Sequence, residues 1–147
     1  MKRIGWLGVL LLMMGGGAWA NDQSEAKLTA IKKMYQQDLK KQNGLATLAH
    51  FAGADLKKAL KKQDAFGAKY GELCGLDYDV LWQSQDPDYA EPLQYALTRK
   101  GQVTVSIGRP EQAQVTYALN CEADRCQITD VFSNGGSVVK MINRTCR

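Results

Sequence analysis

The stretch that decides the fold runs from Leu93 to Leu119 and reads LQYALTRKGQVTVSIGRPEQAQVTYAL. Apolar and polar residues alternate in three short runs, at positions 93–97, 103–107 and 113–119. This period of two is typical of strands that bury one face. Segments rich in glycine, proline and charged residues separate the runs and favour turns. The stretch therefore predicts three consecutive antiparallel strands.

The downstream sequence predicts one more strand and a helix. Cys121 and Cys126 flank four polar or small residues, which indicates a hairpin-like connection into a fourth strand over residues 127–132. The Asn134–Gly136 segment breaks that strand. Ser137 then has the position of an N-cap for a short C-terminal helix.

Upstream of Gly71 the periodicity is helical. Asp22 and Glu25 have the spacing of a capping box, so a helix is expected to begin at Asp22. Apolar residues at helical intervals form its buried stripe, and Asn43-Gly44 is expected to end it. A second helix is expected between Gly53 and Gly71. The first stripe comprises Leu28, Ile31, Tyr35 and Leu39. The fold class is α+β, with N-terminal helices packed on a curved antiparallel sheet of about four strands.

Four lysine pairs fall largely off these apolar stripes, at positions 32/33, 40/41, 57/58 and 61/62. Such pairs suit an anion-binding face or a membrane-surface face. A solvated helix face that keeps the protein soluble is the interpretation that the sequence alone favours.

The N-terminal segment, residues 1–20, has the organisation of a cleavable signal peptide. Lys2 and Arg3 precede an apolar run, and Ala18-Trp19-Ala20 offers small residues for cleavage after Ala20. The run is shorter than the roughly 20 residues needed to span a bilayer. We therefore expect a mature domain over residues 21–147, located in the periplasm of a Gram-negative-type bacterium. An uncleaved anchoring helix is the rival interpretation.

Charge argues against nucleic acid as a partner. The whole chain has a formal net charge of +4, and removal of Lys2 and Arg3 with the signal peptide lowers it to +2. A nucleic-acid-binding domain is usually much more basic. We also expect no membrane span in the mature chain, because no second long apolar run occurs.

All four cysteines lie in the expected mature domain. An even number of cysteines in an exported chain indicates two disulfides. Cys121 and Cys126 are suited to a local bond across the hairpin, which leaves Cys74 to pair with Cys146. The 121/126 spacing does not match common zinc patterns, and His50 is the only histidine. No metal or cofactor is expected.

Residues for catalysis are scarce. His50 lies in an apolar helical neighbourhood, where a lone histidine is more often a surface or half-buried side chain than a general base. The chain has no nucleophile elbow, metalloprotease motif or phosphate loop. The sequence therefore predicts no catalytic set and favours a protein that is not an enzyme.

The segment from Glu72 to Glu91 contains six acidic residues and no lysine or arginine. Its carboxylates suit a surface for a basic protein partner, a calcium site or acid–base chemistry. A solvated loop with Asp-stabilised turns is the simplest alternative. If the segment functions, we expect a protein-contact surface. Its candidate binding residues are Asp77, Asp79, Asp86, Asp88 and Glu91.

Two ordered motifs resemble signatures of an exported bacterial family, domain-of-unknown-function family 3828. They are Leu76-Asp77-Tyr78-Asp79 with Gln85-Asp86, and residues 128–138, which read ITDVFSNGGSV. The resemblance covers residues 34–143 and implies a cystatin-like or nuclear-transport-factor-2-like cone. One departure is Cys126, which stands near a position that is commonly aromatic in the family, and it puts the packing of the hairpin in doubt.

Within the second motif we interpret Asp130 as a structural group that ties the last strand to the following turn, in preference to a catalytic carboxylate. The residues assigned to this structural turn are Asp130, Ser133, Asn134, Gly135, Gly136 and Ser137.

The favoured function is a non-enzymatic periplasmic module that binds another protein, such as an immunity protein that neutralises a toxin attacking the cell wall. The alternative is a small-ligand-binding or enzymatic domain that uses the interior of the cone. A deep interior pocket would favour the alternative, and a filled core would favour protein binding.

Overall fold

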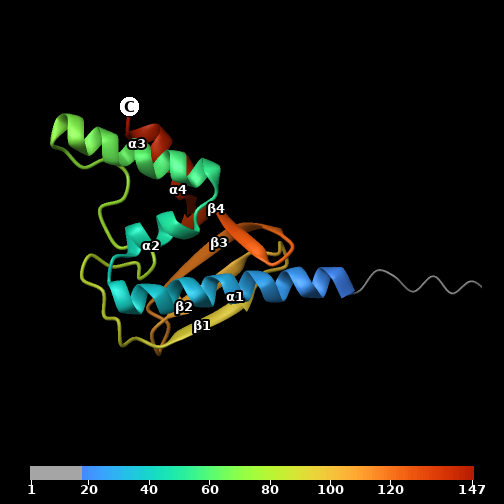
Figure 1. Ribbon diagram of the computed structural model, residues 1–147. Coiled ribbons are helices and arrows are strands. Elements are labelled where there is room, and N and C mark those ends of the chain that lie inside the picture. Colours follow the sequence, from blue (N-terminus) through green and yellow to red (C-terminus); the bar gives the residue numbers. More distant parts are fainter. Residues whose placement is uncertain (1–17) are drawn as a thin grey trace, which may run out of the picture.

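The computed structural model describes residues 18–147, and it describes side chains from Gln23 onward. Three helices come first: α1 (Ala18–Lys41), α2 (Gly44–Phe51) and α3 (Ala54–Tyr70). An antiparallel sheet and the short helix α4 (Val138–Thr145) follow. The chain is therefore α+β (Figure 1). Most of the expected signal peptide lies outside the described residues, and positions 18–20 form the start of α1.

The sheet has five strands in the order β1-β2-β3-β4-β5, and each pairs with its sequence neighbour. The strands are β1 (Leu93–Leu97), β2 (Val103–Ile107), β3 (Ala113–Glu122), β4 (Arg125–Ser133) and β5 (Gly136–Ser137). β1 and β2 have the predicted bounds, and β3 and β4 are longer than predicted. The expected number of about four strands is wrong by one.

The additional strand, β5, results from a tight hairpin. Ser133 pairs with Gly136, and the two residues between them have positive φ, 49° for Asn134 and 77° for Gly135. Asn-Gly is the preferred sequence for a two-residue turn with this backbone conformation. The segment therefore reverses the chain as well as ending β4.

Both ends of the first predicted helix differ in the structure. α1 begins at Ala18, so Asp22 lies within the helix and is not its N-cap. At the other end Gln42, with φ of 50°, breaks the helix, and the Asn43 side chain caps α2 by accepting a hydrogen bond from the Ala46 N–H at 3.1 Å. Asn43 and Gly44, the expected stop of the first helix, are thus the start of α2, a helix that the sequence did not predict. Asn can serve either role, because its short side chain caps helices and tolerates turns.

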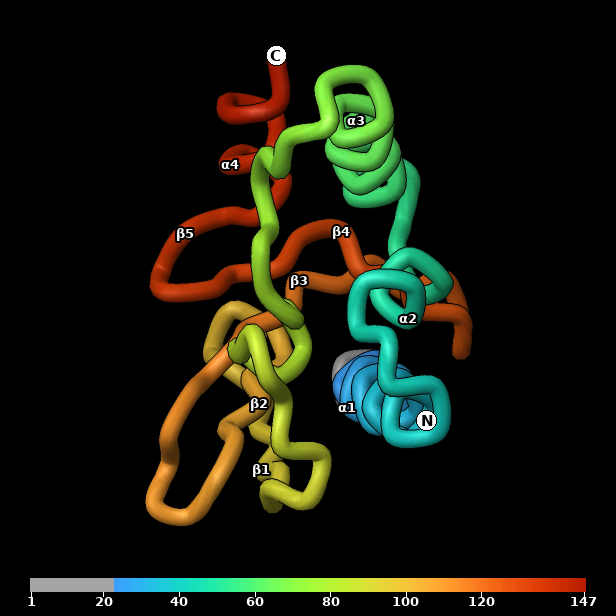
Figure 2. Tube along the Cα trace, turned by 90° about the vertical axis from the view of Figure 1, so that its left-hand side faces the viewer, coloured from blue at the N-terminus to red at the C-terminus, as the bar shows by residue number. Residues whose placement is uncertain are grey.

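The core lies between the helices and one face of the sheet. Ile31, Met34 and Tyr35 of α1 are completely buried, as are Val105 of β2 and Tyr117 of β3. Figure 2 shows α1 beside β1 and β2, while α3 and α4 lie side by side at the other end of the molecule. The space between α1 and the sheet is therefore filled by large side chains.

One residue of the predicted α1 stripe is misplaced. Leu39 is 43% exposed, whereas its neighbour Asp38 is completely buried. Asp38 follows Ile31 by seven residues and therefore lies on the same side of the helix.

Two disulfides are present, with the expected partners. Cys74 is bonded to Cys146, and their Cα atoms are 5.3 Å apart. Cys121 is bonded to Cys126, directly across the β3–β4 pair, with Cα atoms 4.0 Å apart. Disulfides of this kind indicate an oxidising, exported environment. Over residues 18–147, no helix has the length and apolar character needed to cross a membrane.

Candidate functional site

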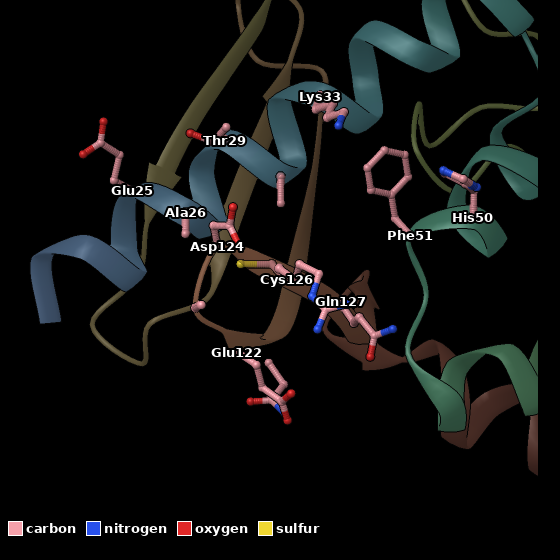
Figure 3. A pocket seen from close by; sticks show the side chains of 14 residues that line it. Glu25, Ala26, Thr29, Lys33, His50, Phe51, Glu122, Asp124, Cys126 and Gln127 are labelled. Atoms are coloured by element: carbon pink, nitrogen blue, oxygen red, sulfur yellow. The ribbon is translucent and has the colours of Figure 1, made fainter. Parts of the chain in front are cut away.

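An open groove of about 1030 Å³ lies between α1, the end of α2 and the β3–β4 hairpin. Figure 3 shows Glu25, Ala26 and Thr29 of α1 near Asp124, Cys126 and Gln127 of the hairpin, with His50 and Phe51 on the side of α2. The lining residues are Glu25, Ala26, Thr29, Ala30, Lys33, His50, Phe51, Asn120, Glu122, Ala123, Asp124, Arg125, Cys126 and Gln127. They come from two regions of the chain, the consecutive helices α1 and α2 and the later β3–β4 hairpin.

The groove has an apolar base and a charged edge. Ala26, Ala30, Phe51 and Cys126 are half-buried. The charged lining residues are exposed; they are Glu25, Lys33, Glu122, Asp124 and Arg125. A half-buried apolar centre surrounded by exposed polar groups is the usual anatomy of a protein-binding surface.

The hairpin that forms one wall is held by covalent and hydrogen bonds. Only Ala123 and Asp124 connect β3 to β4, and Ala123 has a φ of 56°. The Cys121–Cys126 disulfide lies next to this turn. Because both cysteines are bonded, neither supplies a thiolate for nucleophilic or metal chemistry.

His50 also lies on the groove, where it is exposed. Its ring makes an edge contact with the ring of Phe51, and the ring centroids are 5.2 Å apart. An imidazole so placed can contribute a hydrogen bond or a stacking surface to a bound partner.

The acidic segment does not form one uniform surface. Asp77, Asp86 and Asp88 are exposed, whereas Asp79 and Glu91 are partly buried. Asp88 accepts a hydrogen bond from the Ala90 N–H at 2.9 Å, and Glu91 accepts one from Gln112 at 3.1 Å. Within the described residues, no group of three or more histidine, cysteine or acidic side chains is arranged to hold a metal ion.

Asp79 lies inward and organises the backbone around it. Its Oδ1 accepts hydrogen bonds from the N–H groups of Leu81 at 2.9 Å and Trp82 at 3.2 Å. Its carboxylate also lies against Gly44, where an added Cβ atom would overlap Oδ1. The structure therefore gives Asp79 a role in holding its own turn against the start of α2.

Burial raises the pKa of Asp79 above its usual value. The hydrogen bond from the Trp82 N–H lowers that pKa, and the negative charge of Asp38 raises it. Asp38 is completely buried, and its Oδ2 accepts a hydrogen bond from the Trp82 indole N–H at 2.8 Å. Its Oδ1 has no hydrogen-bond partner among residues 18–147.

A pair of buried tyrosines continues this polar cluster. The hydroxyl of Tyr35 donates to the Leu81 carbonyl at 2.6 Å and lies 2.8 Å from the hydroxyl of Tyr117. Burial is the main reason that the pKa of each phenol is raised above its usual value. Both phenols are therefore neutral, and their hydrogen bonds join α1 to the sheet and to the 79–84 turn.

Asp130 contacts the start of α4. Its Oδ2 accepts a hydrogen bond from the Ser137 hydroxyl at 2.5 Å, and its Oδ1 accepts one from the Val139 N–H at 3.1 Å. Ser137 in turn accepts from the Lys140 N–H as the N-cap of α4. The carboxylate thus connects β4 to the helix that follows the turn.

Ser133 brings the two family-like motifs together. Its hydroxyl accepts a hydrogen bond from the Tyr78 hydroxyl at 2.9 Å and donates one to the Gln83 side chain. Tyr78 and Gln83 belong to the loop before the sheet, and Ser133 ends β4. Asn134 and Gly135 form the turn itself.

Comparisons of the chain with protein-family models, with curated proteins and with solved structures found no match.

Proposed function

We propose that the chain is a non-enzymatic periplasmic module that binds another protein and acts as an immunity protein against a toxin that attacks the cell wall. The observation that carries the proposal is the open groove with its apolar base and charged edge. A surface of this form accommodates a protruding loop or helix of a partner.

The filled interior supports protein binding over the small-ligand alternative. Ligand pockets usually enclose most of the ligand surface. Here the region between α1 and the sheet is occupied by Tyr35, Tyr117 and Val105, all completely buried. The groove lies outside that region, on the side of α1 that faces the hairpin tip.

Charge supports a basic partner. Glu25, Glu122 and Asp124 outnumber the cations Lys33 and Arg125 along the groove. The 71–92 loop carries three further exposed carboxylates, Asp77, Asp86 and Asp88, outside the groove. A negative field accelerates association with a positively charged protein.

Membership of family 3828, with its cystatin-like cone, is part of the same proposal. It is supported by the convergence of the two motifs at Ser133 and by the helices that cover one face of the antiparallel sheet. The predicted signal peptide and the two disulfides support location in the periplasm.

A capture experiment with matched variants tests the proposal. Tagged protein is expressed together with the products of its neighbouring genes, and bound proteins are isolated from the exported fraction. We expect Glu122→Lys with Asp124→Lys to abolish capture of the partner, and Asp86→Asn with Asp88→Asn to slow its association. Asp55→Lys on α3 is the control, because it is exposed and lies outside the groove. Capture that is unaffected by the hairpin variant would exclude the groove as the binding site.

A further inference from the structure

The loop after α3 presents an unusually exposed leucine. Leu73 is 84% exposed, and Tyr70, at the end of α3, is 51% exposed. Leu73 is followed by Cys74, whose disulfide to Cys146 fixes this part of the backbone. A single exposed apolar side chain is ordinary, but a contiguous group of them marks an interaction site.

Leu73 follows the end of α3, and lysines and aromatic rings lie along one side of that helix. Lys58, Lys62, Phe66 and Tyr70 follow one another at intervals of four residues, so they lie along one side of the helix. The rings of Phe66 and Tyr70 are 4.6 Å apart, and Lys69 Nζ lies 4.8 Å from the Tyr70 ring. We call this surface the basic–aromatic patch; it comprises Lys58, Lys62, Phe66, Lys69, Tyr70 and Leu73.

The basic–aromatic patch belongs to the end of the molecule formed by α3 and α4, away from α1 and β1 (Figures 1 and 2). Lys62 Nζ donates a hydrogen bond to the Asn143 carbonyl of α4 at 3.2 Å. The acidic residues nearby are Asp55 in the first turn of α3, Asp64 and Glu72. Asp64 is two residues from Phe66 and therefore lies about 200° around the helix from it. Three lysines thus accompany the patch, against two acids, Glu72 next to it in the sequence and Asp55 on the same side of the helix as Lys58 and Lys62.

We propose that the basic–aromatic patch binds the surface of an anionic phospholipid membrane. Leucine, phenylalanine and tyrosine side chains are suited to the boundary between headgroups and acyl chains. Lysine stems extend along such apolar surface while their charged ends contact the anionic headgroups. The positive charge around the exposed Tyr70 and Leu73 fits this occupant and does not fit a basic protein. The site is independent of the groove, which lies between α1, α2 and the hairpin.

The test measures binding to vesicles. The protein is purified after export and its mass is determined. It is then sedimented with two kinds of vesicle, one of phosphatidylglycerol and phosphatidylcholine in equal parts and one of phosphatidylcholine alone. We expect binding to the anionic vesicles only, and release by salt. Tyr70→Ser with Leu73→Ser lowers the affinity by at least about tenfold, because it removes the inserted apolar surface. Lys58→Glu with Lys69→Glu lowers it by roughly 25-fold or more at low salt.

Matched controls make the result decisive. Leu97→Ser, on β1, removes a partly exposed leucine outside the patch and binds as the wild-type protein does. Glu122→Lys with Asp124→Lys changes the groove and also leaves vesicle binding intact, so the two proposals fail separately. Absence of binding, equal binding to neutral vesicles, or an unaffected Tyr70/Leu73 variant would overturn the proposal. Self-association that depends on Leu73, without vesicle binding, would instead identify a second copy as the occupant.

Discussion

The hydroxyl oxygens of Tyr78 and Ser133 lie 2.9 Å apart, although the residues are separated by 55 positions in the chain. The same serine contacts Gln83. This hydrogen-bonded group fastens the long loop before the sheet to the end of β4. It is the point at which two distant motifs become one structural unit.

We expect the two residues to be energetically coupled. Tyr78→Phe removes one hydrogen bond and lowers the free energy of unfolding by about 1 kcal/mol. Ser133→Ala costs somewhat more, because Ser133 is buried and contacts two partners. The double variant should lose about 0.5–1 kcal/mol less than the sum of the single losses. Denaturant unfolding of the four proteins measures the coupling, and strict additivity would show that the bond contributes nothing.

The two disulfides should differ in their contribution to stability. The bonded cysteines are 72 residues apart in one case and 5 in the other. Loop closure predicts about 4 kcal/mol for Cys74–Cys146 and about 2 kcal/mol for Cys121–Cys126. Denaturation midpoints of the two double Cys→Ala variants test this order. Equal losses would mean that local packing outweighs chain entropy.

Asp79 should make stability depend on pH in the acidic range. Its folded-state pKa is raised, so the folded protein binds more protons than the unfolded chain between the unfolded pKa and the folded one. The contribution of Asp79 to stability therefore decreases as pH rises through that window. Asp79→Asn removes this contribution. In unfolding curves between about pH 4 and pH 7, the free energy of unfolding of the wild type should increase relative to that of the variant as pH falls.

Gly44 should not tolerate a side chain, in contrast to Gly67. A Cβ at Gly44 would overlap the Asp79 carboxylate, whereas a Cβ at Gly67 comes no nearer than 3.7 Å to the Glu72 carbonyl oxygen. We expect Gly44→Ala to lower the melting temperature, with a loss of about 1–3 kcal/mol. Gly67→Ala, in the helix α3, should stabilise by about 0.5–1 kcal/mol. Combining Gly44→Ala with Asp79→Ala should cost less than the sum, since the overlap is then removed.

Calcium should not stabilise the acidic segment. Asp79 is occupied by backbone N–H groups, and Asp88 and Glu91 have partners of their own. A ligand that binds only the folded state raises the melting temperature in proportion to the logarithm of its excess over Kd. We expect thermal scans with and without calcium to coincide. A rise that grows with calcium concentration would identify a metal site.

Much of the sheet could be predicted because alternation is a local signal. β2 buries every second residue, β1 half-buries Leu93 and Tyr95, and the sequences of both strands show this alternation directly. β5 could not be predicted in this way, because two residues carry no periodicity. Its signal was the Asn134-Gly135 pair, which specifies a hairpin turn as well as a strand end.

The helices were less fully predictable, since neighbouring signals compete. The Asp22–Glu25 spacing is compatible with a cap, but residues 18–21 contain no proline or glycine and continue the helix. Asp38 was missed because it lies in a segment rich in lysine and glutamine. Its position seven residues after Ile31 was the available signal. The groove had no sequence signal at all, because Phe51 and Cys126 line one groove only when α2 and the hairpin are packed together.

If the chain is exported with its N-terminus first, as proposed above, the Cys74–Cys146 bond sets an order of events. A chain that crosses the membrane from its N-terminus exposes Cys121 and Cys126 before Cys146 emerges. The hairpin can therefore be oxidised while translocation is still in progress, and the bond at Cys74 cannot. Until Cys146 emerges, Cys74 is a free thiol that can pair with Cys121 or Cys126. Rapid closure of the short hairpin loop joins Cys121 to Cys126 first, and this protects the chain from a mispaired intermediate.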